Sequence, residues 1–352
     1  MKDFNDHIIS DNRSVVDALT QINQLSGNLN LTLFVCDSQG KMLGTLTDGD
    51  FRRGFMKGLK LDDSIDSFMV KNFRHFTLND INVAHIKELR AKQIKLVPLL
   101  DEDGRIIKVY DFTQRKTILP VDAVLMAGGR GERLRPLTDT TPKPMLLIGN
   151  KPIIEHNIDN LTTNGIDNFF VTVNYLADQI VNHLGNGEKK GIRIECVKET
   201  KPLGTIGSVS LIKNFNNDTV LIMNSDLFTN INFEDFYLDF VEKNAAMSIA
   251  SVPYQISVPY AVLNQDNETV DSFEEKPTYT YHANAGIYLI KKELLDIIPI
   301  STHFNATDFI QALLNSGRKV IKYPIIGYWI DIGKHEDYNK AQEFAKHINS
   351  QS

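Results

Sequence analysis

Cysteine is scarce in this sequence, and long hydrophobic runs are absent. Only Cys36 and Cys196 occur among 352 residues, each inside an apolar or mixed run typical of a strand. This pattern favours buried free thiols in a reducing compartment over a disulfide or a zinc site. No apolar run approaches the length of a membrane span, and residues 1–7 lack the core of a signal peptide. We therefore expect a cytoplasmic protein with no zinc and no membrane partner.

Basic residues are also too few to form an extended positive face. The sequence has 38 Lys and Arg against 44 Asp and Glu, a formal net charge of −6, and no basic stripe. Binding to a nucleic-acid backbone needs such a face, so we expect no nucleic-acid partner. The length suits two domains, each with its own core.

The positive charge that is present concentrates in one stretch, VLMAGGRGERLRPLTDTTPKPMLL, residues 124–147. A run typical of a buried strand is followed by three glycines, whose missing side chains let backbone N–H groups approach an anion. Four cations stand within fourteen residues: Arg130, Arg133, Arg135 and Lys143. This pattern indicates a polyphosphate cradle. It is neither a Walker A loop nor the dinucleotide fingerprint, because Leu134 stands where the latter has its third glycine.

Almost residue for residue, this stretch resembles the signature Gly-Gly-x-Gly-x-Arg-Leu-x-Pro-Leu-Thr…Pro-Lys-Pro of the sugar-1-phosphate nucleotidyltransferases. The resemblance implies that an NTP and a sugar 1-phosphate react to give an NDP-sugar and pyrophosphate, on a GT-A-like fold. It also implies nucleotide contacts from eight positions: Leu125, Ala127, Gly128, Gly129, Gly131, Glu199, Gly204 and Thr205.

From Val121 onward, apolar strand-like runs alternate with helical patterns. We expect strands at 121–127, 168–173, 191–197 and 219–224, and helices at about 152–164, 175–184, 205–213 and 233–243. Such alternation predicts an α/β, Rossmann-like fold with a mostly parallel sheet and helices on both faces. Ligands bind at the carboxyl ends of such strands, so the loops after the first, third and fourth strands should meet at one edge.

The first third of the chain contains a weak internal repeat with an offset of 64 residues. LFVCDSQGK at 33–41 matches VPLLDEDGR at 97–105, and each copy reads as a helix, a strand, a glycine turn and a second strand. The order resembles an α+β cystathionine-β-synthase-type (CBS) domain pair. Residues 112–120 lack periodicity and end in proline. We therefore expect a regulatory or dimerising CBS pair at 1–118 and a nucleotidyltransferase domain at 119–352, in a homo-oligomer.

In a CBS pair, the resemblance implies an adenosine-type ligand, with Thr47 and Asp50 on the ribose hydroxyls. A helix N-cap explains the same two residues equally well. The second copy departs from the pattern at Lys108, Asp111 and Gln114, which leaves one of the two ligand sites in doubt.

Two aspartates follow apolar runs in the second domain. Asp226 ends the run at 219–223, and Asp331 stands within Trp-Ile-Asp-Ile-Gly. One carboxylate alone is often a helix cap, but two of them with substrate phosphates supply the hard oxygen ligands that Mg²⁺ prefers. The resemblance likewise implies a metal held by Asp226 and Asp331. No Asp-x-Asp follows this strand, which disfavours a glycosyltransferase.

The resemblance extends to Glu-Lys-Pro at 275–277 and Asn-Ala-Gly-Ile-Tyr at 284–288. It implies that Glu275 binds sugar hydroxyls, that Lys276 meets the sugar phosphate, and that Asn284 and Gly286 line the sugar pocket. A surface ion pair is the alternative for Glu275 and Lys276.

The reaction needs no general base, because the attacking phosphate oxygen is already an anion at neutral pH. Catalysis then consists of positioning two polyanions and neutralising charge. We expect Arg133 to act on the departing pyrophosphate, Lys143 on the α-phosphate, Lys276 on the sugar phosphate, and Mg²⁺ as the cofactor.

Glu199 stands where uridine- and thymidine-using relatives carry glutamine. A carboxylate only accepts hydrogen bonds and suits the two donors on guanine, which favours GTP. The domain arrangement resembles bacterial guanylyltransferases for glucosamine 1-phosphate, in surface-glycan or legionaminic-type sugar synthesis. Three alternatives stay open: a mannose- or heptose-1-phosphate guanylyltransferase, a UTP or dTTP enzyme, and a catalytically silent nucleotide sensor.

Overall fold

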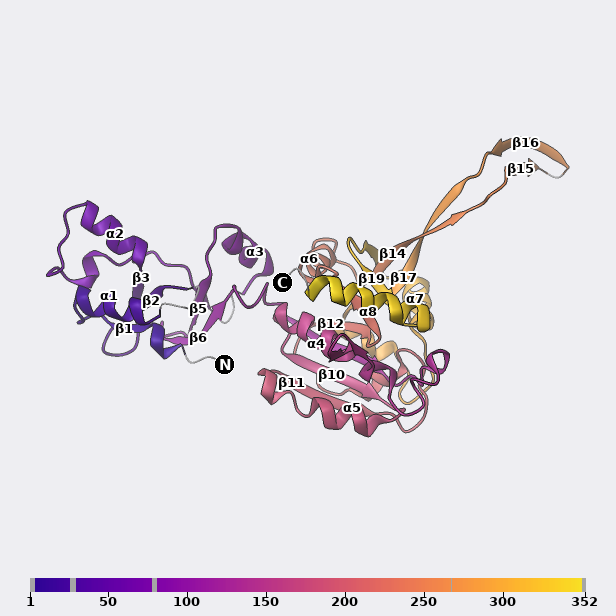
Figure 1. Ribbon diagram of the computed structural model, residues 1–352, viewed down its shortest axis with the longest axis horizontal. Coiled ribbons are helices and arrows are strands. Elements are labelled where there is room, and N and C mark those ends of the chain that lie inside the picture. Colours follow the sequence, from indigo (N-terminus) through magenta and orange to yellow (C-terminus); the bar gives the residue numbers. More distant parts are fainter. Residues whose placement is uncertain (1–3, 26–29, 78–80, 267, 350–352) are drawn as a thin grey trace. The chain divides into compact units, whose positions relative to one another are not determined.

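The computed structural model describes residues 4–25, 30–77, 81–266 and 268–349 (Figure 1). The chain divides into two compact units, Met1–Ile118 and Leu119–Ser352. Within the described residues, no helix is long and apolar enough to cross a membrane.

The first unit holds two small sheets of the same design. Each has three strands, with the first pair parallel and the second antiparallel. The strands are β1 (Ile8–Ser10), β2 (Thr32–Cys36), β3 (Met42–Thr47), β4 (Phe76–Thr77), β5 (Leu96–Leu100) and β6 (Ile106–Asp111). The helices are α1 (Val15–Gln24), α2 (Asp48–Met56) and α3 (Val83–Ala91). Residues 112–120 contain no helix that would correspond to α2.

The turns of the two copies match in detail. Asp37 Oδ1 accepts hydrogen bonds from the N–H groups of residues 39 and 41, and Asp101 Oδ1 accepts them from residues 103 and 105. Gly40 and Gly104 have φ of 81° and 80°, a left-handed conformation that glycine adopts without strain. The internal repeat predicted from the sequence is therefore confirmed.

The second unit is built on a seven-stranded sheet of order β11-β10-β7-β12-β17-β14-β18. Its strands are β7 (Val121–Ala127), β10 (Asn168–Val173), β11 (Arg193–Lys198), β12 (Thr219–Asn224), β14 (Met247–Ser257), β17 (Thr278–Lys291) and β18 (Val320–Pro324). Only β17 runs antiparallel to its neighbours. The mostly parallel α/β sheet is confirmed, and so are the four strands predicted from the sequence.

The helices of this unit are α4 (Ile153–Thr163), α5 (Ala177–Leu184), α6 (Phe233–Glu242), α7 (Ala306–Asn315) and α8 (His335–Asn349). The segment predicted as a helix at 205–213 is instead a short 3-10 helix, η6 (Gly207–Leu211). Strands β7 and β12 are almost wholly buried, because packed elements cover both faces of the sheet.

A smaller core fixes the glycine-rich stretch. The short ribbon of β13 (Leu227–Thr229) and β19 (Trp329–Asp331) packs with this stretch and with α8 in one apolar cluster. The buried side chains of this core are Leu134, Leu146, Ile148, Ile153, Phe228, Ile332, Ala341 and Ala345. The cationic loop is therefore packed down on its apolar side.

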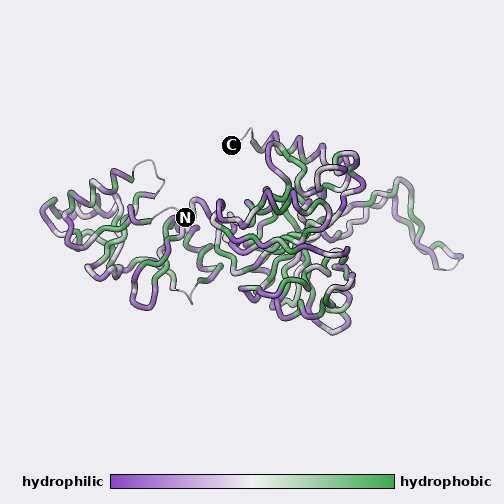
Figure 2. Tube along the Cα trace, turned by 90° about the horizontal axis from the view of Figure 1, so that it is seen from below, coloured by the Kyte–Doolittle hydropathy of each residue, from purple (hydrophilic) through white to green (hydrophobic). Residues whose placement is uncertain are grey.

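Strands β14 and β17 are longer than the sheet that they join. Their outer halves pair as a two-stranded ribbon, which continues into the hairpin of β15 (Val262–Asp266) and β16 (Thr269–Glu274). We call residues 252–283 the arm. The arm projects away from the sheet of the second unit (Figures 1 and 2).

Both cysteines are free thiols, as predicted. Cys36 is buried, whereas Cys196 is only half-buried. Burial, with a smaller contribution from Asp37, raises the pKa of the Cys36 thiol to about 11.

The first prediction concerns Asp122, which is fully buried in β7. Its carboxylate accepts hydrogen bonds from the Asn168 amide, the Asn217 amide and the backbone N–H groups of Asn216 and Asn217, at 2.6–2.9 Å. Because each buried donor left without a partner costs about 1–3 kcal/mol, Asp122→Ala should lower the free energy of unfolding of this unit by at least ~2 kcal/mol.

Trp329 is the only tryptophan, so its fluorescence during urea unfolding reports on the second unit alone. Asp218→Ala is the matched control, because this side chain is fully exposed near the same turn. Equal urea midpoints for the two variants would contradict the role given to Asp122.

Candidate active site

Lys143 is the charged centre of the second unit. It begins the 3-10 helix η4 (Lys143–Met145) at the end of the glycine-rich stretch and is only 9 % exposed. Its ammonium donates a hydrogen bond to the carboxylate of Asp226 and lies 3.9 Å from Oδ1 of Asp331. The structure therefore brings together three residues that lie far apart in the sequence.

Backbone pairing places the two aspartates side by side. Asp226 lies between β12 and β13, and Asp331 ends β19. In the β13–β19 ribbon, Leu227 pairs with Asp331, and the Ile332 N–H donates to the Asp226 carbonyl at 3.2 Å. The position of each carboxylate is thus set by the main chain.

Polar side chains that were not predicted from the sequence as site residues support the turn that holds Asp226. The Asn157 amide donates to the Ser225 carbonyl at 3.2 Å, and the Ser225 hydroxyl donates to the Met126 carbonyl at 2.7 Å. Asn157 is buried in the first half of α4. Nothing in its local sequence distinguishes it from an ordinary helix residue.

The charges of Asp226 and Asp331 affect each other, and two neighbouring cations balance them. Burial raises the pKa of Asp331, and the neighbouring Asp226 charge adds to this effect, while Lys143 and Arg133 oppose it. The second oxygen of Asp226, Oδ1, is buried and accepts no hydrogen bond. A free carboxylate oxygen beside a second carboxylate fits Mg²⁺, which takes few protein ligands and completes its shell with water and phosphate oxygens. No group of three or more His, Cys, Asp or Glu is arranged for a metal among the described residues.

The glycines leave room for a ligand at the end of β7. A Cβ on Gly129 would meet nothing within 4 Å, so the backbone there is open. Gly131 has φ of 64°, and a Cβ there would lie 3.0 Å from Thr138 and 3.1 Å from Lys143. Gly131 therefore lets the loop fold tightly against the lysine, while Gly129 exposes backbone.

Arg133 is an exposed residue of the 3-10 helix η3 (Glu132–Leu134). A Cβ on Gly333 would lie 3.3 Å from its guanidinium, which places Arg133 next to the turn that follows Asp331. Leu125 and Ala127 are buried within β7, so their side chains belong to the sheet core.

Glu199 lies directly beside the glycine loop. A Cβ on Gly128 would lie 2.8 Å from Oε1 of Glu199, while Oε2 accepts a hydrogen bond from the Leu203 N–H at 3.3 Å. Burial raises the pKa of Glu199, and hydrogen bonds from Leu203, Asn174 and Ser208 oppose the rise. Asn174 immediately follows β10, so extending the strand-end rule to the second strand would have identified it.

Gly204 and Thr205 have structural partners in the turn before α7. Gly204 has φ of 80°, and a Cβ there would lie 2.7 Å from the Phe304 carbonyl. The Thr205 hydroxyl accepts from the Ala306 N–H at 2.8 Å. These contacts fix the loop after β11, and the nucleotide contacts of both residues stay a prediction.

Asn284 and Gly286 lie on β17 where it meets β12. Gly286 has φ of 72°, and a Cβ there would lie 2.5 Å from the Asn224 amide nitrogen, so the position favours glycine. The Asn284 amide donates to the Tyr288 hydroxyl at 2.8 Å. Trp329 Nε1 donates to the Ala285 carbonyl at 3.0 Å, which ties β17 to the strand that ends in Asp331. The predicted sugar-side residues Asn284 and Gly286 therefore adjoin the Asp226 turn.

The structure does not bring Glu275 and Lys276 to this cluster. Both residues are exposed on the arm, beyond the pair Ser257–Thr278, whereas Asn284 pairs with Ser251 at the base of the arm. Lys276 has φ of 45°.

In the first unit, Thr47 and Asp50 form the N-cap of α2. Asp50 N–H donates to the Thr47 hydroxyl at 3.3 Å, and the Asp50 carboxylate accepts from the Thr47 N–H at 2.9 Å and from the Thr47 hydroxyl at 2.6 Å. Arg53 donates to the other Asp50 oxygen at 2.6 Å. The cap interpretation is confirmed, and the ribose contact stays a prediction.

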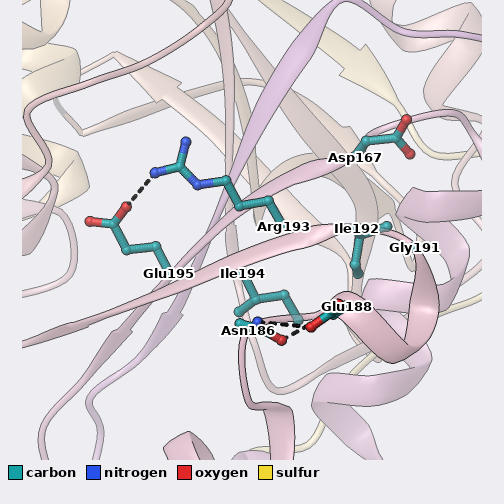
Figure 3. Close-up of a pocket in the computed structure, with 8 residues that line it drawn as sticks. All are labelled: Asp167, Asn186, Glu188, Gly191, Ile192, Arg193, Ile194 and Glu195. Atoms are coloured by element: carbon teal, nitrogen blue, oxygen red, sulfur yellow. Dashed lines mark hydrogen bonds and ion pairs between the residues drawn. The ribbon is translucent and has the colours of Figure 1, made fainter.

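A hollow of about 600 Å³ lies elsewhere in the second unit, lined by Asp167, Asn186, Glu188 and residues 191–195. Figure 3 shows Arg193 directed toward Glu195, and Asn186 toward Glu188. Asp167 and Arg193 precede or begin β10 and β11, so this hollow is at the amino ends of the strands. Ligands of parallel sheets bind at the opposite edge, where Lys143 and Asp226 lie.

Comparison with known proteins concerns the second unit. The family model described as nucleotidyl transferase matches residues 122–347. A probable mannose-1-phosphate guanylyltransferase 1 from Oryza sativa subsp. japonica is 33 % identical over 227 residues, covering 61 % of this chain and 62 % of its own. A UTP–glucose-1-phosphate uridylyltransferase from Synechocystis sp. is 30 % identical over 239 residues, with 62 % of each chain covered.

Among solved structures, HddC from Yersinia pseudotuberculosis is similar with a TM-score of 0.51 and 27 % identity, over 63 % of this chain and 98 % of that one. A further structure of HddC, complexed with GMP-PN, matches with a TM-score of 0.50 and 25 % identity. The matched segment spans about three fifths of the length of the two sequence relatives. With a family model matching 122–347, the chain belongs to the nucleotidyl transferase family.

Proposed function

We propose that this chain transfers a nucleotidyl group from an NTP to a sugar 1-phosphate, releasing pyrophosphate. The observation that carries the proposal is the buried Lys143 ammonium between Asp226 and Asp331, beside an open glycine loop. The proposal also draws on the relatives, whose names include guanylyltransferases and a uridylyltransferase for sugar 1-phosphates.

In this reaction, a phosphate oxygen of the sugar 1-phosphate attacks the α-phosphorus of the NTP. The bond from the α-phosphorus to the bridging oxygen breaks, and pyrophosphate leaves with the electron pair. The nucleophile is already ionised, so the chain has only to align the two polyanions and neutralise charge. Lys143 faces the α-phosphate in this scheme, and the exposed Arg133 binds the leaving pyrophosphate.

Asp226 and Asp331 are the residues that would hold Mg²⁺. When bound there, the ion would draw the phosphate oxygens together and offset their negative charge. The free Oδ1 of Asp226 is the feature of this chain that supports the assignment.

GTP is the NTP that we propose, because Glu199 lies next to Gly128 and its carboxylate can accept from the two guanine donors. The guanylyltransferase names of the relatives and the complex of HddC with GMP-PN support this choice. UTP or dTTP is the alternative, in keeping with the uridylyltransferase relative.

For the sugar, glucosamine 1-phosphate in surface-glycan or legionaminic-type synthesis is our first proposal, with mannose and heptose 1-phosphates as alternatives. Pyrophosphate release, assayed with four NTPs against these sugar phosphates and glucose 1-phosphate, tests the proposal. No product with any pair would favour a silent nucleotide sensor instead.

For the first unit, we keep an adenine nucleotide as a second proposed ligand, supported by the two matching copies of its fold. Titration calorimetry with AMP and ATP tests it. If neither nucleotide gives a heat of binding with the full chain, an adenine nucleotide is excluded as a ligand of the first unit.

The second prediction is that Asp226→Asn lowers turnover by about 100-fold or more, because the variant loses the charge that the proposed Mg²⁺ needs. The rise in melting temperature caused by adding Mg²⁺ together with GTP should also disappear. Asp178→Asn, an exposed change in the same unit, is the control and should behave as wild type. Turnover within a few-fold of wild type would exclude Asp226 as a ligand.

The third prediction is that Glu199→Gln lowers kcat/KM for GTP by about 10- to 100-fold relative to UTP, because an amide cannot accept from both guanine donors.

Protonation of Glu199 also removes a hydrogen-bond acceptor, so the affinity of the wild type for GTP should fall with falling pH. Because burial raises the pKa of Glu199, the fall should begin at a higher pH than for an ordinary glutamate. Competition binding of GTP between pH 4.5 and 8 measures this fall, which is compared with the pKa of about 4.3 of an ordinary glutamate. Glu199→Gln should abolish the pH dependence of GTP affinity.

A further inference from the structure

Asp226 is held through the two peptide groups that flank it. The carbonyl of Ser225, in the peptide before Asp226, accepts a hydrogen bond from the Asn157 side-chain amide at 3.2 Å. The carbonyl of Asp226 itself, in the peptide that follows, accepts from the Ile332 N–H at 3.2 Å. Because each peptide group is planar, these contacts restrain the two backbone dihedral angles between the planes. They therefore restrain the direction in which the Asp226 side chain leaves the backbone.

The two contacts differ in origin. Ile332 donates from its main chain, so this contact does not depend on side-chain identity. Asn157 is a buried residue of α4 that donates from its side chain, so a single substitution removes the contact. Ser225 is also fixed to β7, because its N–H and its hydroxyl both donate to the Met126 carbonyl, at 3.2 and 2.7 Å. The Asn157 amide thus completes a turn that is otherwise held by main-chain contacts and by Ser225 itself.

Helix α4 is a firm support for this amide. Four aliphatic side chains on its inner side are fully buried: Ile153, Ile154, Ile158 and Leu161. One turn beyond Asn157, the Asn160 amide donates to the Thr229 carbonyl at 3.4 Å. The helix therefore contacts both ends of the segment 225–229.

Ion pairs hold the opposite side of α4. Glu155 and Asp159 stand two positions before and after Asn157, about 200° around a helix of 3.6 residues per turn. Lys190 bridges the two carboxylates at 2.8 and 2.6 Å, and Lys151 lies 2.6 Å from Asp159. Single pairs of this exposure contribute little, but a network on one side and buried aliphatic side chains on the other restrain the helix against rotation.

The restraint matters because of the oxygen that Asp226 has free. The Lys143 ammonium donates to one carboxylate oxygen, whereas Oδ1 is buried and accepts no hydrogen bond from the described part of the chain. Mg²⁺ demands near-ideal octahedral geometry, with oxygens at about 2.0–2.1 Å. A small rotation of the peptide before Asp226 would displace Oδ1 by more than this geometry tolerates.

We propose that Asn157 is a positioning residue of the reaction, which orients the Asp226 carboxylate for the divalent cation through the Ser225 carbonyl. Asn157 acts through the backbone and reaches neither the phosphates nor the metal. The inference rests on the proposed function, because it takes Asp226 to be a metal ligand. It assigns a role in the site to a helix that carries none of the sequence motifs.

The fourth prediction is that Asn157→Leu raises the Mg²⁺ concentration needed for half-maximal turnover by about 10-fold. The variant keeps the approximate side-chain volume and removes the donor, and groups that orient metal ligands typically contribute about 10- to 100-fold to metal affinity or activity. The KM for GTP at saturating Mg²⁺ should stay near that of the wild type. Asn157→Gln keeps an amide donor and should recover part of the loss. An unchanged Mg²⁺ requirement in Asn157→Leu overturns the inference.

Metal binding is measured separately, with GTP but without sugar 1-phosphate, so that no turnover occurs. The fluorescence of Trp329, the only tryptophan, follows the melting of the second unit. The melting temperature should rise with Mg²⁺ concentration, and the form of this rise gives an apparent Kd. In Asn157→Leu this Kd should be about 10-fold higher than in the wild type, whatever the melting temperature of the variant without Mg²⁺.

Asn160→Leu is the matched control, because the same change is made one turn along α4 and its partner, Thr229, lies three residues beyond Asp226. This variant should keep the wild-type Kd for Mg²⁺. An equal increase in both variants would show a general loosening of α4 and would overturn the inference, as would a wild type that Mg²⁺ does not stabilise. If only Asn157→Leu binds Mg²⁺ more weakly but no substrate pair releases pyrophosphate, the proposed function fails and the positioning role stands.

Discussion

The second unit depends on one buried balance of charge, a lysine held between two carboxylates. Lys143 is 9 % exposed, so its ammonium needs an anionic partner, and Asp226 supplies it. Removing one member of a buried pair costs about 3–5 kcal/mol, because the other charge then stands unpaired. The apolar core behind the glycine-rich stretch and the β13–β19 ribbon hold these groups in place. The charges are therefore positioned by the fold itself, which is what the proposed group transfer needs.

The sheet explains why distant motifs meet. Strands β7, β11 and β12 run in the same direction, so the residues that follow each of them share one edge. This brings Gly128 beside Glu199 and Lys143 beside Asp226. The hollow at the amino ends of the strands lacks such a convergence of loops, which argues for a structural rather than a catalytic role.

The sequence was informative wherever local pattern determines structure. Apolar runs located β7, β10, β11 and β12, and the repeat of Asp37 and Asp101 located the two turns of the first unit. The prediction of a helix at 205–213 was wrong. Gly204 and Gly207 pack against the backbone at 302–304, and the segment forms only a short 3-10 helix. The role of Asn157 could not be predicted, because it consists of a hydrogen bond to the Ser225 carbonyl that no local sequence pattern encodes.

The arm shows the limit of such reasoning most clearly. No strand was expected at 252–283 from the sequence, and pairing between two strands does not say which surface a ribbon covers. The resemblance of Glu-Lys-Pro at 275–277 to a family motif implies a chemical role but gives no location, and the structure places these residues on the arm. The backbone pairing of the arm holds its two strands together but leaves its large apolar side chains exposed, so the pairing alone does not explain why the sequence places them there.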